Sequence, residues 1–548
     1  MASRSAPVLD VSAGAETQLR SRRALLAGLR AELLGVIALA LLAGVVRYPY
    51  LWLEPRITDE WREAQRGLLI AQGHGFPATN VAPYIGALWN YLLAIAYLIL
   101  GDDLRVPRLV AMLLGALTVV PTYLLGRELG GRLVALLAAL LMVTSPVHVL
   151  TNSHIAWSNC ITPLFTTAGL WLLVGAARRA DGRWLALSGL AFGLAFQTHP
   201  TALAVLPGAL LYLWQRGRPL LRGIWLPLAG ALFLVASLNV VVFITAYPAD
   251  FFGSIQSRQE DYNRRAPPTF VQRYWTNAGY LWLSLGRLPS GAVLTDNNWA
   301  HILAHPLIWL YAGALGAGAV LSARRGQPLA ADVAAPALVL LPLFQPGSYY
   351  PVPDGRYAMP LLPVLYASLA YALTRPSTQA ATPLPARPSS PLRPLWAQEG
   401  LLRRLLPGGR LAALLILALA LIPLGPIRAY YAADAERRAV YSRLWETLLL
   451  VQQTMPRHAT VLLDENLKAI IDENNTEKRT ESLLDMAGFD ARYQLIDPAD
   501  PAVAISDRHA VYLLTCQTYQ AGRRTLGLVP LDAGAPDDCQ VLRAARLP

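Results

Sequence analysis

The chain has 548 residues, of which 54% are hydrophobic and only 15% are charged. Soluble domains are about one-quarter charged, so this composition excludes an ordinary soluble protein and indicates a membrane protein. The formal net charge of +12 is carried almost wholly by arginine, which is typical of basic cytoplasmic loops, and we expect no nucleic-acid partner.

Residues 1–30 are polar and carry several arginines, and we interpret them as a cytoplasmic segment before an uncleaved signal anchor. A polytopic α-helical membrane protein is predicted from there to residue 428, because long continuous apolar runs recur and do not alternate as barrel strands do. The runs are 31–53, 84–100, 106–126, 132–150, 161–177, 184–198, 201–214, 224–246, 302–321, 329–347, 358–374 and 411–428.

Basic clusters between these runs predict which loops face the cytoplasm. They lie at 126–132, 177–183, 214–222, 322–326 and 375–410. All of them fall on one side only if 84–100 (YIGALWNYLLAIAYLIL) is an interfacial or re-entrant helix and not a span. That leaves about eleven transmembrane helices, with 54–105 as the first loop outside.

An acidic pair stands at the start of this first outside loop, in RITDEWREAQRG (56–67). Asp59 could act as a general base or as a metal ligand, with Glu60 beside it raising its pKa. The alternative is structural, because Thr58 or Asp59 could cap a following helix that favours acids in its first turn. Both hypotheses can hold together, since a cap also fixes the geometry of a base.

Two polar stretches interrupt later apolar runs. TNSHIAWSNCITPLF (151–165) contains His154 and Asn159 on the expected outer side, either in a hydrogen-bonded turn or in a substrate site. FQTHPTA (196–202) places His199 before Pro200. Polar groups at membrane depth need partners or a wet cavity, so His199 either closes a kinked turn or lines a cavity that touches substrate.

Two further outside segments carry charge. The loop 247–301 contains SRQEDYNRRAPPTF (257–270), in which Glu260 and Asp261 are candidates for an acceptor-binding or gating role beside the alternative of a solvated loop. In PGSYYPVPDGRYAMPLLP (346–363), Arg356 and Tyr357 stand at the mouth of a span. Arg356 could clamp a lipid phosphate bidentately, or extend to the interface beside an aromatic belt.

The composition changes after residue 428. Residues 429–548 contain both lysines of the chain, Lys468 and Lys478, and many acids. Short strands are predicted at 460–467 and 510–516 and an amphipathic helix at 441–455, which together indicate a soluble α/β domain outside the cell membrane. Cys516 and Cys539 could form a disulfide there or remain free thiols. Residues 375–410 between two apolar runs, rich in proline, serine and alanine up to residue 400, are a flexible cytoplasmic linker.

Nucleotide-binding and hydrolase motifs such as the P-loop, HExxH and GxSxG are absent from the sequence. A membrane enzyme without them needs a substrate that is already activated. Two other classes stay open, namely a transporter or flippase of a lipid-linked envelope precursor and a non-catalytic assembly protein. Transporters often show internal repeats, and no convincing repeat relates the two halves of this chain.

The order and sidedness of these pieces resemble the GT-C fold, and more closely glycosyltransferase family 39, which contains the protein O-mannosyltransferases and the bacterial aminoarabinose transferases. The similar stretches are ITDEWREAQRGLLIAQGHGFP (57–77), residues 104–149, IAWSNCITPLF (155–165), residues 186–208 and GRYAMPLLPVL (355–365). The resemblance covers most of 31–375 and none of the C-terminal part.

The resemblance implies an inverting glycosyltransferase in a bacterial cell membrane. The donor would be a sugar on a polyprenyl phosphate, mannose by family analogy, and the acceptor a protein, lipid or glycan on the non-cytoplasmic face. Asp59 would be the base with Glu60 in support, and Arg356 with Tyr357 would lie near the donor phosphate, with His154, His199 and Asn159 as further substrate contacts.

The chain departs from the family pattern at two places. Relatives often carry an acid where this chain has Ser158 and Asn159, and some use a lysine near the phosphate, whereas residues 1–467 contain none. The need for a divalent metal ion therefore stays open, and phosphate binding falls to arginine.

Overall fold

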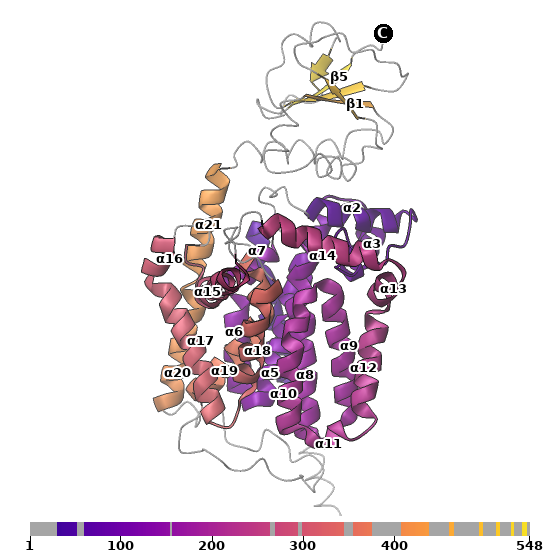
Figure 1. The fold of residues 1–548 in the computed structure, drawn as a ribbon. Helices are drawn as coiled ribbons and strands as arrows, with labels where there is room; N and C mark the ends of the chain where they lie inside the picture. Colours follow the sequence, from indigo (N-terminus) through magenta and orange to yellow (C-terminus); the bar gives the residue numbers. More distant parts are fainter. Residues whose placement is uncertain are drawn as a thin grey trace, which may run out of the picture.

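The computed structural model of the chain describes residues 30–51, 60–153, 156–263, 269–293, 299–344, 354–374 and 407–437, together with five short strands between residues 460 and 544. Most of the helices run side by side as a bundle, and shorter ones lie across one end of it (Figure 1). We call this end, which carries α2, α3 and α14, the α2 end, and the opposite one, which carries α11, the α11 end.

The bundle is built from a first helical segment, Arg30–Tyr50, and the helices that follow it. In chain order these are α2 (Glu60–Ala71), α3 (Leu88–Leu100), α4 (Val106–Leu117), α5 (Val119–Gly130), α6 (Arg132–Val143), α7 (Pro146–Thr151), α8 (Thr162–Arg179), α9 (Gly182–Thr198), α10 (Leu206–Arg216), α11 (Arg218–Leu221), α12 (Trp225–Ala236), α13 (Leu238–Ala246), α14 (Pro248–Asn263), α15 (Phe270–Ser290), α16 (Trp299–Ala304), α17 (Pro306–Arg324), α18 (Leu329–Phe344), α19 (Leu362–Thr374), α20 (Pro407–Leu421) and α21 (Leu424–Arg437). Four 3₁₀ helices complete the set, η1 (Tyr48–Tyr50), η2 (Ser158–Ile161), η3 (Pro200–Val205) and η4 (Asp354–Leu361).

The predicted polytopic membrane fold agrees with the length and apolarity of these helices. Among the described residues, six helices are long and apolar enough to cross a membrane, or up to seven if one bent pair counts as a span. Several other expected spans correspond to helices that are shorter, such as α6, or that are joined across a break. The count of eleven spans therefore stays a prediction.

The segment 84–100 forms α3, whose 13 residues give a helix of only about 20 Å, whereas a bilayer core is about 30 Å thick. Helix α3 packs against α2, and the two form a hairpin (Figure 1). A Cβ added at Gly67 would lie 2.7 Å from the Leu93 Cβ, so the close approach of the two helices requires glycine there. This arrangement agrees with an interfacial segment.

The run 224–246, which was expected to be one span, is bent by 71° between α12 and α13. The bend falls at Ser237, whose hydroxyl donates to the Phe233 carbonyl at 2.8 Å and so competes with the helical backbone bonds. After the bend, the Asn239 side chain donates to the Ala78 carbonyl at 2.6 Å. The apolar pattern could not predict the bend, because it is stabilised by a contact to a distant loop.

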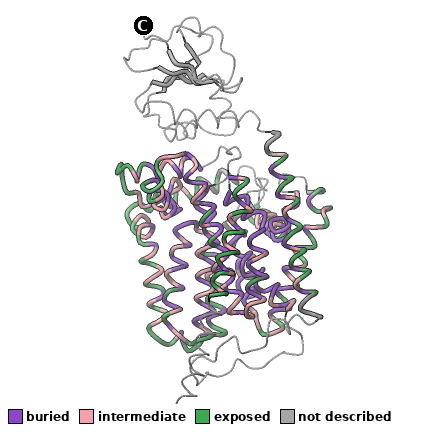
Figure 2. The backbone as a smooth tube through the Cα atoms, turned by 180° about the vertical axis from the view of Figure 1, so that it is seen from behind, coloured by how far each residue is buried: buried purple, intermediate pink, exposed green. Residues whose placement is uncertain are grey.

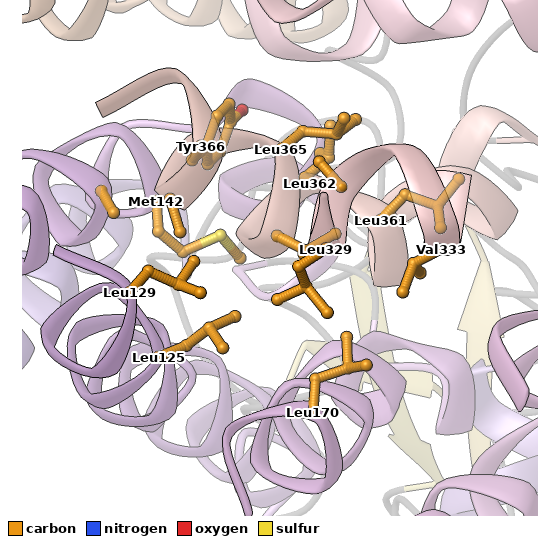
Figure 3. Packing of buried hydrophobic residues seen from close by; sticks show 14 of the residues in the cluster. Leu125, Leu129, Met142, Leu170, Leu329, Val333, Leu361, Leu362, Leu365 and Tyr366 are labelled. Atoms are coloured by element: carbon orange, nitrogen blue, oxygen red, sulfur yellow. The ribbon is translucent and has the colours of Figure 1, made fainter. Parts of the chain in front are cut away.

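A large apolar cluster, to which most helices contribute, forms the centre of the bundle. Leu125, Leu129 and Met142 from α5 and α6 face Leu362, Leu365 and Tyr366 from α19 (Figure 3). Exposed positions gather on the outer helix surfaces (Figure 2), and many of them are large apolar residues such as Leu33, Leu98 and Leu414. Apolar side chains on the perimeter are expected where a helix faces lipid.

The C-terminal part contributes a five-stranded sheet in the order β2-β1-β3-β5-β4. Its strands are β1 (Thr460–Asp464), β2 (Tyr493–Ile496), β3 (Val511–Thr515), β4 (Leu528–Pro530) and β5 (Gln540–Ala544). β1 pairs in parallel with β2 and β3, whereas β5 is antiparallel to β3 and β4. The strands predicted at 460–467 and 510–516 are present as β1 and β3, and the expected helix 441–455 and the Cys516–Cys539 pair lie outside the described residues.

Candidate active site at the α2 end of the bundle

The second residue of the predicted acidic pair, Glu60, begins α2 and is completely buried. Its carboxylate accepts a hydrogen bond from the Arg108 Nε at 2.9 Å, and Arg108 is completely buried as well. Arg108 also donates to the Leu51 carbonyl, at 3.1 Å. The ion pair therefore joins the end of the first helical segment, the start of α2 and the start of α4. Asp59 lies outside the described residues.

Burial dominates the electrostatics of Glu60. It raises the pKa of this carboxyl group, and the charge of Arg108 and a backbone hydrogen bond from Ala156 offset the increase only in part. Burial also raises the pKa of Tyr97 on α3, and the nearby Glu60 charge contributes in the same direction. The first turn of α2 thus lies in a poorly solvated environment, where charge interactions are strong.

A second carboxylate, Glu63, was missed by the sequence analysis. It accepts hydrogen bonds from the backbone amide of Ser158 at 2.7 Å and from the Ser158 hydroxyl at 3.1 Å. The Glu63 carbonyl accepts from the Asn90 side chain of α3 at 2.8 Å. Glu60 and Glu63 are three residues apart and lie on one helical face, which is the signal that could have predicted a shared role.

Asn159 follows Ser158 in η2, and its side chain is only 6% exposed. Its Oδ1 has no hydrogen-bond partner among the described residues. Buried amide oxygens are normally satisfied, so this atom is available to a substrate group or to a part of the chain that is not described. The predicted substrate role of Asn159 is compatible with its position. His154 lies outside the described residues.

The loop between α2 and α3 contacts the last turn of α9 and the first turn of α13. Gln197 donates to the Ala236 carbonyl at 2.8 Å, and Asn239 donates to the Gln197 Oε1 at 3.0 Å as well as to the Ala78 carbonyl. A Cβ at Gly86 would lie 2.8 Å from the Gln197 carbonyl oxygen. The polar residues of 196–202 therefore position the first loop through side-chain hydrogen bonds.

Two predicted substrate-binding residues from distant segments lie together. The ring of His199, at the break between α9 and η3, is 5.1 Å from the ring of Tyr357 in η4. The His199 Nδ1 accepts from the Thr201 amide at 3.2 Å, so this side chain also caps η3. The contact brings 196–202 to 354–361 as the prediction of one site requires, while the capping bond agrees with the kinked-turn alternative.

The remaining predicted residues are not joined to this group by described contacts. Glu260 is exposed on α14 and accepts from the Gln256 side chain of the same helix at 2.9 Å. Asp261 lies next to it on α14, and Arg356 precedes Tyr357 in η4, but their side chains are outside the described set. Their roles stay predictions.

A divalent metal ion needs several oxygen or imidazole ligands around one point. Within the described parts of the chain, no group of three or more His, Cys, Asp or Glu side chains is close enough to hold an ion. Glu60 is engaged by Arg108 and Glu63 by Ser158. The described residues thus do not fit a metal ion.

Comparison with known proteins gives a partial match to one family and a structural likeness over most of the chain. Residues 86–243, from just before α3 to α13, match the family described as dolichyl-phosphate-mannose-protein mannosyltransferase. The chain is similar in structure, over 94% of its length and 98% of that chain, to ArnT from Cupriavidus metallidurans bound to undecaprenyl phosphate, with a TM-score of 0.54 and 14% identity. This is a GT-C fold.

The likeness to the apo state of the same ArnT is nearly equal, with a TM-score of 0.53. At 14% identity, these matches establish the GT-C fold and not a substrate. The dolichyl-monophosphooligosaccharide–protein glycotransferase AglB of Haloferax volcanii is 32% identical over 165 residues, which are 25% of this chain and 15% of AglB. The chain thus matches only a small part of that relative. The predicted GT-C resemblance is confirmed, and the chain is an integral membrane protein.

Proposed function

We propose that the protein is a glycosyltransferase that moves a sugar from a polyprenyl-phosphate donor to an acceptor on the non-cytoplasmic face of the membrane, with inversion. The observation that carries the proposal is the GT-C fold shared over 94% of the chain with an ArnT that was solved with undecaprenyl phosphate. The match of residues 86–243 to a mannosyltransferase family supports it, because that segment contains α3, η2 and His199.

In the proposed reaction, Asp59 accepts the proton of an acceptor hydroxyl group. The acceptor oxygen forms a bond to the anomeric carbon, the bond from that carbon to the phosphate oxygen breaks, and the lipid phosphate leaves with the negative charge. The transition state has oxocarbenium character, so carboxylates near the sugar ring stabilise it electrostatically. The base must lie within hydrogen-bond reach of the hydroxyl group that it deprotonates.

Glu60 anchors the base in this scheme. Its buried bond to Arg108 holds the first residue of α2 in place, and Asp59 directly precedes that residue. Glu63 has the corresponding role for the second loop, because its two bonds to Ser158 set the position of Asn159. Both are positioning residues, and together they order the two segments between which the acceptor would bind.

The donor phosphate is assigned to the side of the site formed by η4. Arg356 would neutralise the phosphate, and Tyr357, held against His199, would orient the donor. His154 would contact the same substrate from the second loop. Glu260 and Asp261 on α14 would contact the acceptor, which is a protein, lipid or glycan. The sugar is mannose in the first instance, by analogy with the matched family.

The test is transfer of radiolabel from polyprenyl-phosphate mannose to a cell-envelope extract by the purified protein in lipid. Asp59→Asn should lower kcat by about 100- to 10,000-fold, the usual contribution of a general base. Asp103→Asn is a matched control, because this carboxylate lies near the start of α4, pairs with Arg105 and has no proposed part in the reaction.

Equal transfer by wild type and Asp59→Asn would leave Asp59 only its alternative as a helix cap. If neither protein transfers mannose, other lipid-linked sugars come next. Failure with every donor, followed by movement of a lipid-linked precursor across vesicles, would replace the proposal by the flippase hypothesis.

A further inference from the structure

Helix α21 contacts both segments that lead into the candidate site. The Tyr431 ring stacks on Tyr50, with 3.9 Å between ring centroids and 10° between the planes. The Tyr431 hydroxyl lies 2.6 Å from the Ser153 hydroxyl, within the range of a good hydrogen bond. Tyr431 is 4% exposed and Ser153 is completely buried, so the contact is shielded from solvent.

The two partners of Tyr431, Tyr50 and Ser153, each stand at the start of a loop of the candidate site. Tyr50 ends the first helical segment, just before the stretch that contains Asp59. Ser153 directly precedes His154 in the second loop, which continues to Ser158 and Asn159. The Tyr431 side chain therefore contacts the residues from which both loops begin, although α21 lies far from both loops along the sequence.

Apolar side chains pack closely around this contact. Val149, Leu150, Ile427 and Tyr430 form one buried apolar cluster with Tyr431. The Tyr430 ring meets the Tyr431 ring edge-on at 5.4 Å, a favourable aromatic geometry. Close packing of this kind resists small displacements.

A second contact joins the first helical segment to the helices that precede the second loop. The Arg47 guanidinium lies 2.7 Å from the His148 Nδ1 and donates to the Val143 carbonyl at 3.2 Å. This joins the first helical segment to α6 and α7 without α21. Removal of the Tyr431 contact should therefore displace the loops without unfolding the helices that carry them.

We propose that Tyr431 is a positioning residue of the active site, which sets the distance between the loop of Asp59 and the loop of Asn159 by binding Tyr50 and Ser153 at once. The inference rests on the proposed function for its catalytic consequence. Displacements of about 1 Å far from the reacting atoms can cost about 100-fold in rate. It also gives α21, the last described helix before the strands β1–β5 in the chain, a role at the site.

The experiment uses Tyr431→Phe, Ser153→Ala and the double variant in full-length protein in lipid. Tyr431→Phe keeps the ring stack and removes only the hydroxyl. Both single variants should lower kcat by about tenfold, with little change in KM for the donor, because binding groups remain while alignment is lost. The double variant should be no worse than either single one, because all three lack the same bond.

The control is Tyr311→Phe. The Tyr311 hydroxyl is also bonded inside the bundle, to the Leu419 carbonyl, and so joins α17 to α20 without contacting either loop. Tyr311→Phe should lower the melting temperature about as much as Tyr431→Phe does, but it should leave kcat unchanged. A wild-type kcat in Tyr431→Phe, or a decrease no larger than in Tyr311→Phe, would overturn the proposal.

Hydrogen–deuterium exchange separates this proposal from the proposed function. In Tyr431→Phe and Ser153→Ala, exchange should rise in peptides covering 52–59 and 154–159 and stay unchanged in α17 and α20, even if no sugar donor supports transfer. Unchanged exchange in those two peptides would show that Tyr431 does not position the loops, whatever activity the protein has.

Discussion

The two ends of the helical bundle both carry paired charges, but in different environments. At the α2 end, Glu60 and Arg108 are both completely buried and form one bond at 2.9 Å. At the α11 end, Glu32 accepts from Arg127 at 2.6 Å and from Arg132 at 3.1 Å, and all three side chains are partly exposed. Glu128 nearby pairs with Arg178 and Arg179, again with partial exposure.

This difference separates an anchoring role from a surface role. Partly exposed pairs are screened by water and salt and contribute little individually, so we expect the α11 end to tolerate the loss of one partner. A buried pair loses the hydration of both ions, and each ion then depends on the other. Such a pair holds backbone segments in place, which suits the residue next to a proposed base.

Removal of Arg108 should have the largest effect on stability. Arg108→Met leaves the Glu60 carboxylate buried without its cation, which should cost about 3–5 kcal/mol in the free energy of unfolding. Arg105→Met, in a partly exposed pair with Asp103, is the control and should cost about 1 kcal/mol or less. Denaturant unfolding in detergent measures both. Equal losses in the two variants would mean that burial of the pair does not matter.

The double variant Glu60→Leu/Arg108→Met sharpens the same comparison. Two apolar side chains in place of a buried pair often restore stability. Transfer activity should stay low, because the anchor of Asp59 is lost, and full activity in the double variant would show that Glu60 has no positioning role.

The Glu60 carboxyl group should make the free energy of unfolding vary with pH. Burial raises the pKa of this group from its ordinary value of 4.5. An acid whose pKa is raised in the folded state contributes stability that is complete below the unfolded pKa and is lost as pH rises through the folded one. The free energy of unfolding of wild type, relative to Glu60→Gln, should therefore fall as pH increases above 4.5. Parallel curves for the two proteins would contradict the raised pKa.

Loss of the carboxylate at the α11 end should have the smallest effect. Glu32→Gln keeps an acceptor for Arg127 and Arg132, so we expect a loss of less than about 1 kcal/mol that decreases further at high salt. Unfolding at two salt concentrations measures it. A loss as large as that of Arg108→Met would show that the two ends are stabilised alike.

The sequence predicted the membrane fold well, because long apolar runs with basic loops between them have few other interpretations. It also predicted the short helix at 84–100, from its length and sidedness, and the strands β1 and β3. It did not predict the bend at Ser237, which is stabilised by Asn239 and the Ala78 carbonyl. The apolar pattern is the same for a straight and a bent helix.

For the site, the sequence singled out the acidic pair, the second loop and His199 with Tyr357 as separate pieces. It could not connect them, since a polar residue in a single sequence does not name its partner. Nothing in the sequence distinguishes Arg108 from the other arginines near apolar runs, or Glu63 from the other charged residues of its helix. Their partners, Glu60 and Ser158, lie far from them along the chain and near them in space.

By itself, the sequence determined that this chain crosses a membrane, where its loops carry charge and which residues could do chemistry. These properties follow from local composition, because each stretch must suit lipid or water by itself. Only the tertiary structure decided that Glu60 pairs with Arg108, that Glu63 binds the second loop through Ser158, and that Tyr431 contacts Tyr50 and Ser153. Such contacts depend on how the helices pack, and packing is a property of the whole chain.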